Sequence, residues 1–109
     1  MHTMANEMMQ AVRLHGTEDL RVEEAAIPVA EAGEGRLRVA YAGICGTDLH
    51  LFDGWELEGA VTMPPMPAII GHELSGVVDS VGPRVERWKV GDRVTVQPQV
   101  YCGDCTFCQ

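Results

Sequence analysis

Three cysteines stand at three-residue intervals near the end of the sequence, at Cys102, Cys105 and Cys108. The turn-forming residues Gly103 and Asp104 between the first two allow neighbouring sulfur atoms to converge on one point. A structural zinc ion takes thiolate ligands at about 2.3 Å and is normally enclosed by four protein ligands. The spacing therefore indicates a metal site to which these residues contribute three ligands.

The three cysteines alone do not identify the metal at this site. The same spacing opens the cysteine run of bacterial iron–sulfur ferredoxins, which continues with a further cysteine and a proline. The 109-residue sequence ends at Gln109, directly after Cys108, so the run itself does not distinguish the two metals. The choice between zinc and an iron–sulfur cluster rests on residues further upstream.

Two more groups of residues that could bind a metal or transfer protons precede the cysteines. The first places a thiol, a hydroxyl, a carboxylate and an imidazole within six positions, at Cys45, Thr47, Asp48 and His50. The second is His72 with Glu73. Cysteine, histidine and glutamate are ligand types of catalytic zinc sites. Taken singly, however, each also has a structural explanation, since an isolated cysteine or histidine is more often a packed core residue.

The elements predicted around these residues are mostly short strands. Alternating apolar and polar residues predict an opening hairpin from 10–14 and 20–23, and a half-buried strand over 36–41 with Leu37, Val39 and Tyr41 on one face. Apolar residues on both parities over 73–81 predict a strand buried on two sides. Residues 88–96 predict a strand pair around a Gly-Asp turn. Short strands with little helix favour a small β-barrel.

One short helix is predicted over residues 47–52, with Cys45 at its entrance and a hydroxyl or carboxylate available as its cap. A long loop without a clear period follows over residues 53–67. Long loops inside a compact domain are often functional. The candidate metal ligands thus lie on both sides of this loop. Cys45 precedes the helix before the loop, and His72 and Glu73 lie after the loop, where the buried strand begins.

The composition excludes several classes of partner. The sequence is 46% hydrophobic and 22% charged, as in a globular chain, and its net charge is -8 with basic residues scattered from Arg13 to Arg93. We expect no nucleic-acid partner, because such proteins carry clustered basic residues. The longest apolar run, near 66–70, is too short for a bilayer, so we expect no membrane association.

Residues 1–8 are predicted to form a loose leader, and the domain is expected to span residues 9–109. The leader lacks the basic region and apolar stretch of a signal peptide, which favours a cytoplasmic location. Thiols stay reduced in that compartment, so the four cysteines are considered as metal ligands before disulfides.

Taken together and in order, the motifs resemble the zinc-dependent medium-chain alcohol and polyol dehydrogenases. The resemblance covers about Met9 to Gln109 and is nearest to the threonine, butanediol and sorbitol dehydrogenases. Five motifs in the same order are far more specific than any one of them, and they favour zinc over an iron–sulfur cluster. The motifs are Cys45 to His50, Gly71 to Glu73 with the following Ser75 to Val78, Val81-Gly82, Val90 to Val94, and the three cysteines.

The resemblance implies a mainly β, GroES-like barrel with a short helix at a catalytic zinc and a cysteine-rich zinc lobe. It implies that Cys45 and His72 are ligands of the catalytic zinc, and that Glu73 is a ligand in the polyol branch or lies nearby in others. It assigns to the structural zinc three of its four cysteine ligands, Cys102, Cys105 and Cys108. The remaining ligands in relatives lie beyond Gln109, so the domain is expected to be truncated within the lobe.

The resemblance also implies roles in proton transfer. The zinc acts as a Lewis acid that lowers the pKa of the substrate alcohol. Thr47 matches the hydroxyl that contacts the alcohol oxygen, and His50 matches the imidazole that passes the proton to solvent. Asp48 matches the carboxylate that orients the ligand histidine, and its alternative role is a helix cap.

Two functions remain open from the sequence. In the first, the parent protein oxidises a secondary alcohol, diol or polyol with NAD or NADP, as a homo-oligomer, and this chain is its zinc-bearing portion. No cofactor-binding residues are predicted here, because no Gly-x-Gly-x-x-Gly follows a strand, and the chain alone is expected to be inactive. In the second, the chain is a non-catalytic GroES-like module that binds a metal or a partner.

Overall fold

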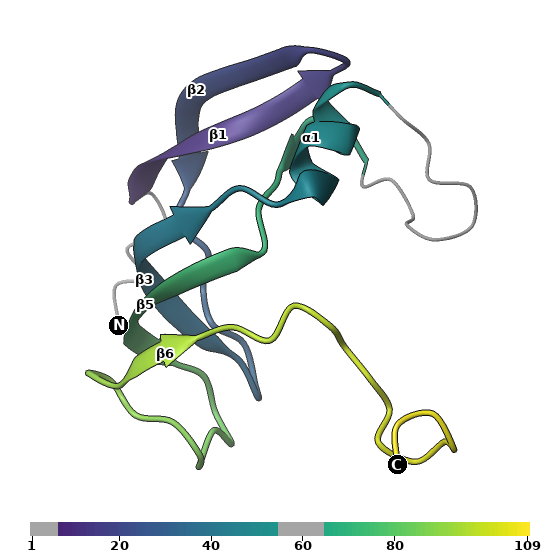
Figure 1. Ribbon diagram of the computed structural model, residues 1–109. Coiled ribbons are helices and arrows are strands. Elements are labelled where there is room, and N and C mark those ends of the chain that lie inside the picture. The colour runs from purple at the N-terminus through teal and green to yellow at the C-terminus, as the bar shows by residue number, and fades with distance from the viewer. Residues whose placement is uncertain (1–6, 55–64) are drawn as a thin grey trace.

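The computed structural model describes residues 7–54 and 65–109, and these residues are mainly strand (Figure 1). Within them a single seven-residue helix interrupts the strands, so the expected mainly β fold with one short helix is confirmed. No helix in these two ranges has the length and apolar character needed to cross a membrane. The elements are β1 (Met8–Gly16), β2 (Asp19–Ala26), β3 (Gly35–Gly43), α1 (Gly46–Phe52), β4 (Ala68–Ile69), β5 (Glu73–Val81) and β6 (Arg93–Thr95).

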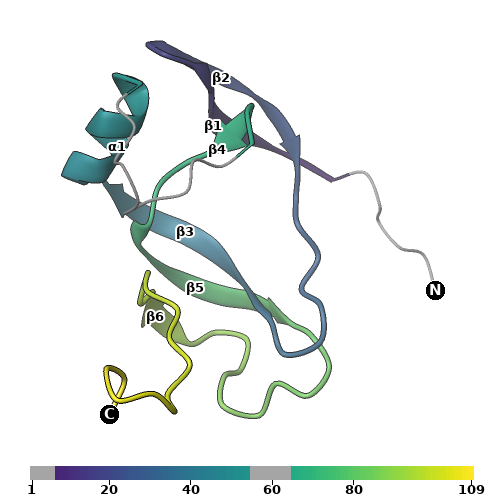
Figure 2. The same cartoon turned by 90° about the vertical axis from the view of Figure 1, so that its right-hand side faces the viewer.

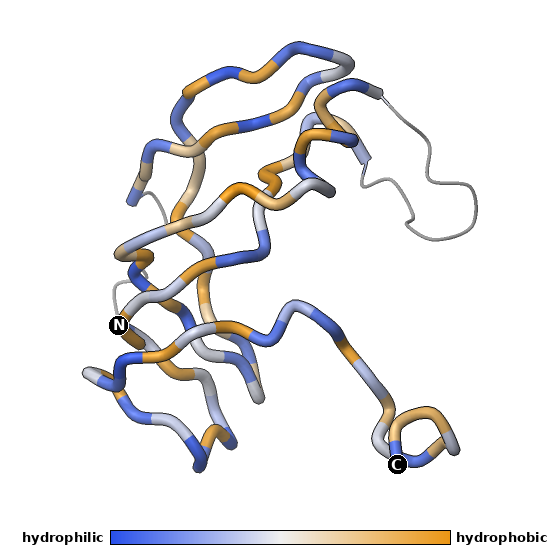
Figure 3. The backbone as a smooth tube through the Cα atoms, in the orientation of Figure 1, coloured by the Kyte–Doolittle hydropathy of each residue, from blue (hydrophilic) through white to orange (hydrophobic). Residues whose placement is uncertain are grey.

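The first sheet has the strand order β2-β1-β4 and is antiparallel throughout. The predicted opening hairpin is confirmed, and hydrophobic and hydrophilic positions alternate along both of its strands (Figure 3). Its turn is tight enough to place Glu18 at a φ of 56°. β1 begins at Met8, one residue before the expected start of the domain, while residues 1–6 of the expected leader lie outside the described residues.

The second sheet has the order β3-β5-β6, with β5 in the centre. The register pairs the end of β3 with the start of β5, at Gly43 and Glu73. β5 has the predicted bounds, 73–81, but only Gly76 and Val78 are buried. Both lie on one face of the strand, so the expected burial on two sides is wrong for the other face. This pairing decides where the site forms, because it brings the residues that follow β3 next to those that precede β5.

The strand over 36–41 was expected to be half-buried, with Leu37, Val39 and Tyr41 on its covered face. This expectation is wrong for two of those three residues. Leu37 is partly buried, but Val39 and Tyr41 are 54% and 79% exposed. β3 is an edge strand whose ladder with β5 is broken by irregularities between Arg36 and Leu37 and between Val39 and Tyr41. A bulge bends and twists a strand, so sequence alternation no longer maps onto one covered face.

The expected strand pair over 88–96 is also corrected, because only its second half is a strand, Arg93–Thr95. The residues before it form a turn closed by the Asp92 N–H donating to the Lys89 carbonyl, and Lys89 Nζ lies 2.7 Å from Asp92 Oδ1. This turn binds β5 directly, since Val78 N–H donates to the Asp92 carbonyl and Gly91 N–H donates to the Val78 carbonyl. Its backbone groups are therefore satisfied by β5 and not by a hairpin partner.

The two sheets do not close into a barrel within the described residues, which corrects the expected closure. Figure 2 shows them as two separate layers, with α1 beside the end of β3. Closure would require hydrogen-bonded pairing between a strand of one sheet and a strand of the other. Each described pairing joins two strands of the same sheet. The buried apolar side chains among the described residues are accordingly few: Leu14, Ala25, Leu51 and Val78. Of the predicted loop over 53–67, residues 55–64 lie outside the described residues.

Candidate metal centres

The first candidate centre begins at the N-terminus of α1, where Cys45 is the N-cap residue in an extended conformation. Its carbonyl accepts a hydrogen bond from Asp48 N–H at 3.0 Å, and its own N–H donates to Asp48 Oδ2 at the same distance. The two reciprocal bonds fix the backbone on both sides of the thiol. The predicted helix entrance at Cys45 is thus confirmed, and the cysteine is held rigidly.

His72 and Glu73 lie close to Cys45 because they stand at the start of β5, the strand that pairs with β3. Gly71, at a φ of +116°, turns the chain into β5, and this left-handed conformation favours glycine. Glu73 then pairs with Gly43, two residues before Cys45. A Cβ atom added at Gly43 would lie 3.2 Å from Glu73 Oε2, so the glycine leaves room for that carboxylate.

Cys45, His72 and Glu73 each offer one ligand atom, and these atoms all lie within 4.8 Å of one another. Cys45 and His72 are 27 positions apart in the sequence, and the structure brings their ligand atoms within this distance. The thiol and the imidazole are half-buried, and the carboxylate is exposed. A cavity of about 530 Å³ lies against His72 and Glu73, so the donors are accessible from one side.

Asp48 connects the helix to the histidine. Its side chain is 11% exposed, and its Oδ1 atom lies 3.6 Å from His72 Nδ1. Oδ1 is buried and, among the described residues, has no hydrogen-bond partner. Metal-binding histidines usually donate their second ring N–H to such a carboxylate. A small rotation of the His72 ring would satisfy Oδ1 and leave Nε2 for a metal, so these residues fit a zinc ion. The sequence presented two alternative roles for Asp48, capping the helix and orienting the histidine. The position of its carboxylate is compatible with both.

Replacing Asp48 by alanine is expected to lower the free energy of unfolding by about 1–2 kcal/mol, because Cys45 N–H loses its acceptor at a helix N-terminus. Asp48→Asn retains an oxygen that can accept this bond and should lose less than half as much. Urea unfolding followed by circular dichroism measures both variants. Equal losses in the two variants would show that the cap bond does not stabilise the helix.

Thr47 and His50 lie on α1 three residues apart, which places them on the same helix face. Thr47 Oγ1 is 3.8 Å from Cys45 Sγ, so the hydroxyl is adjacent to one of the candidate ligand atoms. Both side chains are half-buried. The arrangement brings the hydroxyl to the donor set, while the role of His50 in proton transfer stays a prediction.

The second candidate centre is the thiol cluster, defined as Cys102, Cys105 and Cys108. Cys108 Sγ lies 3.6 Å from Cys102 Sγ and 3.4 Å from Cys105 Sγ, and all three sulfur atoms lie within 4.8 Å. The cluster is in a C-terminal loop that an extended segment connects to β6 (Figure 1). The backbone N–H groups of Asp104 and Cys105 donate to Cys102 Sγ and lower the pKa of that thiol to about 7. The sulfur atoms therefore converge as the spacing predicts.

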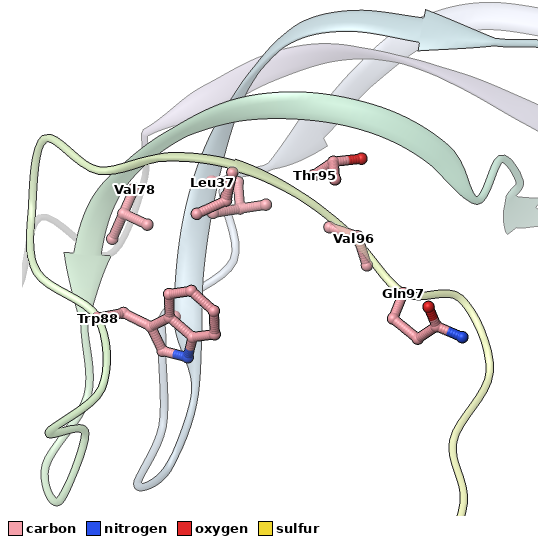
Figure 4. A pocket seen from close by; sticks show the side chains of 8 residues that line it. Leu37, Val78, Trp88, Thr95, Val96 and Gln97 are labelled. Carbon is pink, nitrogen blue, oxygen red and sulfur yellow. The ribbon is translucent and has the colours of Figure 1, made fainter.

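An apolar cavity of about 230 Å³ beside β5 and β6 was not predicted from the sequence (Figure 4). The indole of Trp88 covers one side of it, next to Leu37 and Val78. None of the residues that line it is titratable, so it offers no acid, base or metal ligand. Its residues are Gly35, Leu37, Val78, Trp88, Val94, Thr95, Val96 and Gln97. No signal in the sequence distinguishes them from ordinary core residues.

Residues 31–109 match the alcohol dehydrogenase GroES-like domain family. With the strand arrangement and the two donor clusters described above, this match establishes the class of the protein. The chain belongs to the alcohol dehydrogenase GroES-like domain family.

Individual relatives are similar to the chain over nearly its whole length. The chain is 38% identical to sorbitol dehydrogenase of Bacillus subtilis over 108 residues, which are 99% of this chain and 30% of that protein. It is similar to a cobalt- and zinc-bound thermostable alcohol dehydrogenase of Pyrobaculum aerophilum, with a TM-score of 0.81 and 38% identity over 94% of this chain and 30% of that one. An alcohol dehydrogenase of Escherichia coli CFT073 complexed with NADH gives a TM-score of 0.77 and 41% identity, covering 94% and 28%. The chain thus spans under a third of these relatives.

Proposed function

We propose that this chain is the zinc-bearing portion of a dehydrogenase that oxidises a secondary alcohol, diol or polyol with NAD or NADP. The observation that carries the proposal is the convergence of Cys45, His72 and Glu73, whose ligand atoms lie within 4.8 Å of one another. Two relatives support the cofactors, because one solved structure holds zinc and cobalt and another holds NADH. Sorbitol dehydrogenase supports the substrate class.

Cys45, His72 and Glu73 would hold the zinc ion, and Asp48 would orient the imidazole from behind. Thiolate, imidazole and carboxylate are all ordinary zinc ligands, and a catalytic site leaves one position open for substrate. When bound, zinc supplies Lewis acidity that makes an alcohol hydroxyl easier to deprotonate. The reciprocal bonds between Cys45 and Asp48 keep the thiol in place without reorganisation.

Thr47 and His50 would carry the proton away from the substrate. The Thr47 hydroxyl, next to Cys45 Sγ, can accept a proton from the alcohol while donating its own. His50 follows on the same face of α1, and its imidazole can pass the proton to solvent. Each group needs only a hydrogen bond to its neighbour, which a bound substrate or water can complete.

The cavity beside the donors favours a substrate with several hydroxyl groups. Tyr41, Glu73 and Ser75 line it next to His72, and Thr95, also in the lining, donates its hydroxyl to the Leu74 carbonyl. Such groups recognise additional substrate hydroxyls by hydrogen bonds, and an analogue without those hydroxyls would leave them unpaired. This lining supports diols and polyols over simple aliphatic alcohols.

The cell compartment and the assembly of the parent protein are also proposed. All four cysteines are free thiols in the structure, which is compatible with a reducing cytoplasm. A homo-oligomeric parent is proposed on the family resemblance. The net charge of -8 supports the absence of a nucleic-acid partner.

Cobalt binding tests the catalytic donor set. A variant with Cys102, Cys105 and Cys108 all replaced by serine retains Cys45 as its one thiol, so any cobalt–thiolate absorption then reports Cys45. We expect this variant to bind Co²⁺ with such a band. Adding His72→Ala should weaken the affinity at least about 10-fold, because a ligand is lost.

His15→Ala is the matched control, since His15 is also half-buried but pairs with Glu23 on the hairpin at 2.7 Å. It should leave the cobalt affinity unchanged. An unchanged band after Cys45→Ser, or an unchanged affinity after His72→Ala, would refute the assigned donor set. Circular dichroism of each variant verifies that its fold is retained.

A further inference from the structure

We propose that the thiol cluster, when it holds no metal, is a peroxide-sensitive redox site that forms one intramolecular disulfide, always including Cys108. The cluster differs from Cys45 in containing several thiols close together. Cys102 and Cys105 are exposed and Cys108 is partly so, and an oxidant in solution therefore reaches them directly. This site is separate from the catalytic donors, so the proposal goes beyond the proposed dehydrogenase function and does not depend on it.

Cys108 is the common partner because its sulfur atom lies near both others, at 3.6 Å from Cys102 and 3.4 Å from Cys105. A disulfide bond is about 2.05 Å long, so either pair must close a gap of only roughly 1.5 Å. The backbone holds Cys105 and Cys108 together, since Cys108 N–H donates to the Cys105 carbonyl at 3.0 Å. Rotation of exposed side chains is sufficient to close the remaining gap.

The reaction balances with hydrogen peroxide as the oxidant. The sulfur of Cys102 or Cys105 attacks one peroxide oxygen, the O–O bond breaks, and a sulfenic acid and one water form. Cys108 sulfur then attacks the sulfenic sulfur, forming the S–S bond and releasing a second water. Two thiols are oxidised by two electrons in total, peroxide is reduced, and both thiol protons end in water. A thiol reductant reverses the oxidation by disulfide exchange.

Metal binding and oxidation compete for the same sulfur atoms. A sulfur in a disulfide is not a thiolate, and a metal-bound thiolate is not free to react with peroxide in the same way. Oxidation would therefore remove two of the three ligands of the thiol cluster and prevent metal binding there. Cys45 has no second thiol in its donor set, so it does not form an intramolecular disulfide.

Thiol counting and intact mass measurement test the proposal on the chelator-treated chain. After brief treatment with hydrogen peroxide, we expect reactive thiols to fall from four to about two, with a mass about 2 Da lower. Peptide mapping should place Cys108 in every disulfide, and dithiothreitol should restore all thiols. Zinc-loaded chain should oxidise at least about 10-fold more slowly.

Two single variants provide the comparison. Cys45→Ser should oxidise as the unaltered chain does, whereas Cys108→Ser should form no intramolecular disulfide and gain oxygen in sulfenic and sulfinic acids instead. A disulfide joining Cys102 to Cys105, a disulfide between chains, or an equal oxidation rate with zinc bound would each overturn the proposal. None of these outcomes bears on cobalt binding at Cys45 and His72, so the two hypotheses fail separately.

Discussion

Replacing Gly82 by alanine is expected to destabilise the protein by about 3 kcal/mol or more, although the change adds one methyl group. A Cβ atom at this position would collide with the Glu31 carbonyl oxygen and lie against the Ala30 carbonyl, and both are backbone atoms. Backbone cannot swing aside as a side chain can, so relief requires moving the whole connection between β2 and β3. Thermal unfolding should show a midpoint lowered by about 12 °C or more.

The same segment is hydrogen-bonded to the residues that follow β5, which explains the size of the expected effect. Gly82 N–H donates to the Glu34 carbonyl and Gly33 N–H donates to the Pro83 carbonyl, both at 2.8 Å. Moving this segment to accommodate a methyl group would stretch both bonds. Gly16→Ala is the control, because a Cβ atom there meets nothing within 4 Å. Similar stability of the two variants would mean that the close approach at Gly82 relaxes at little cost.

The hairpin, α1 and β5 could be predicted from the sequence because their signals are local. Alternation over 10–14 and 20–23 determines a two-stranded unit whose partner is its own neighbour in the chain. The apolar residues of β5 predict the bounds of the strand, although only the face with Gly76 and Val78 is buried, and burial of the other face was wrongly expected. Likewise, the helix start at Cys45 depends on Asp48, only three positions away.

The features that were mispredicted depend on distant partners. Whether Val39 and Tyr41 are covered depends on what packs against β3, and alternation only states that they share a face. The turn from Lys89 to Asp92 docks on Val78 instead of on a hairpin partner, and nothing in its own residues specifies that choice. The prediction of a closed barrel failed for the same reason, because closure requires hydrogen-bonded pairing between strands far apart in the sequence.

The candidate site could be predicted in part. The thiol cluster is visible from spacing, since its three sulfur atoms converge within seven residues. Cys45 and His72 are 27 positions apart, and residue types alone do not place them together. Their proximity follows from the β3–β5 register, which pairs Gly43 with Glu73. Only the family resemblance anticipated this pair and the carboxylate beside it, and the structure places Asp48 Oδ1 3.6 Å from His72 Nδ1.

Steady-state oxidation of diols, polyols or threonine by this 109-residue chain with NAD⁺ or NADP⁺ is expected to be undetectable, even with zinc loaded. The sequence contains no Gly-x-Gly-x-x-Gly that follows a strand and opens a helix, so we expect the chain not to hold the nicotinamide in position. Positioning two reactants in a near-attack arrangement supplies about 7–11 kcal/mol of the barrier. Its loss corresponds to a rate lower by about five to eight orders of magnitude.

The residues that remain cannot compensate for this loss. The proposed proton transfer through Thr47 and His50 would contribute about 10²–10⁴-fold at most, and only if hydride leaves at the same time. The cavity at His72 and Glu73 also admits water, which weakens every electrostatic interaction inside it. The measurement is the absorbance of reduced nicotinamide over hours at high chain concentration. Turnover that Cys45→Ser abolishes and Cys102→Ser preserves would show that the zinc-bearing portion alone can position the cofactor, contrary to this expectation.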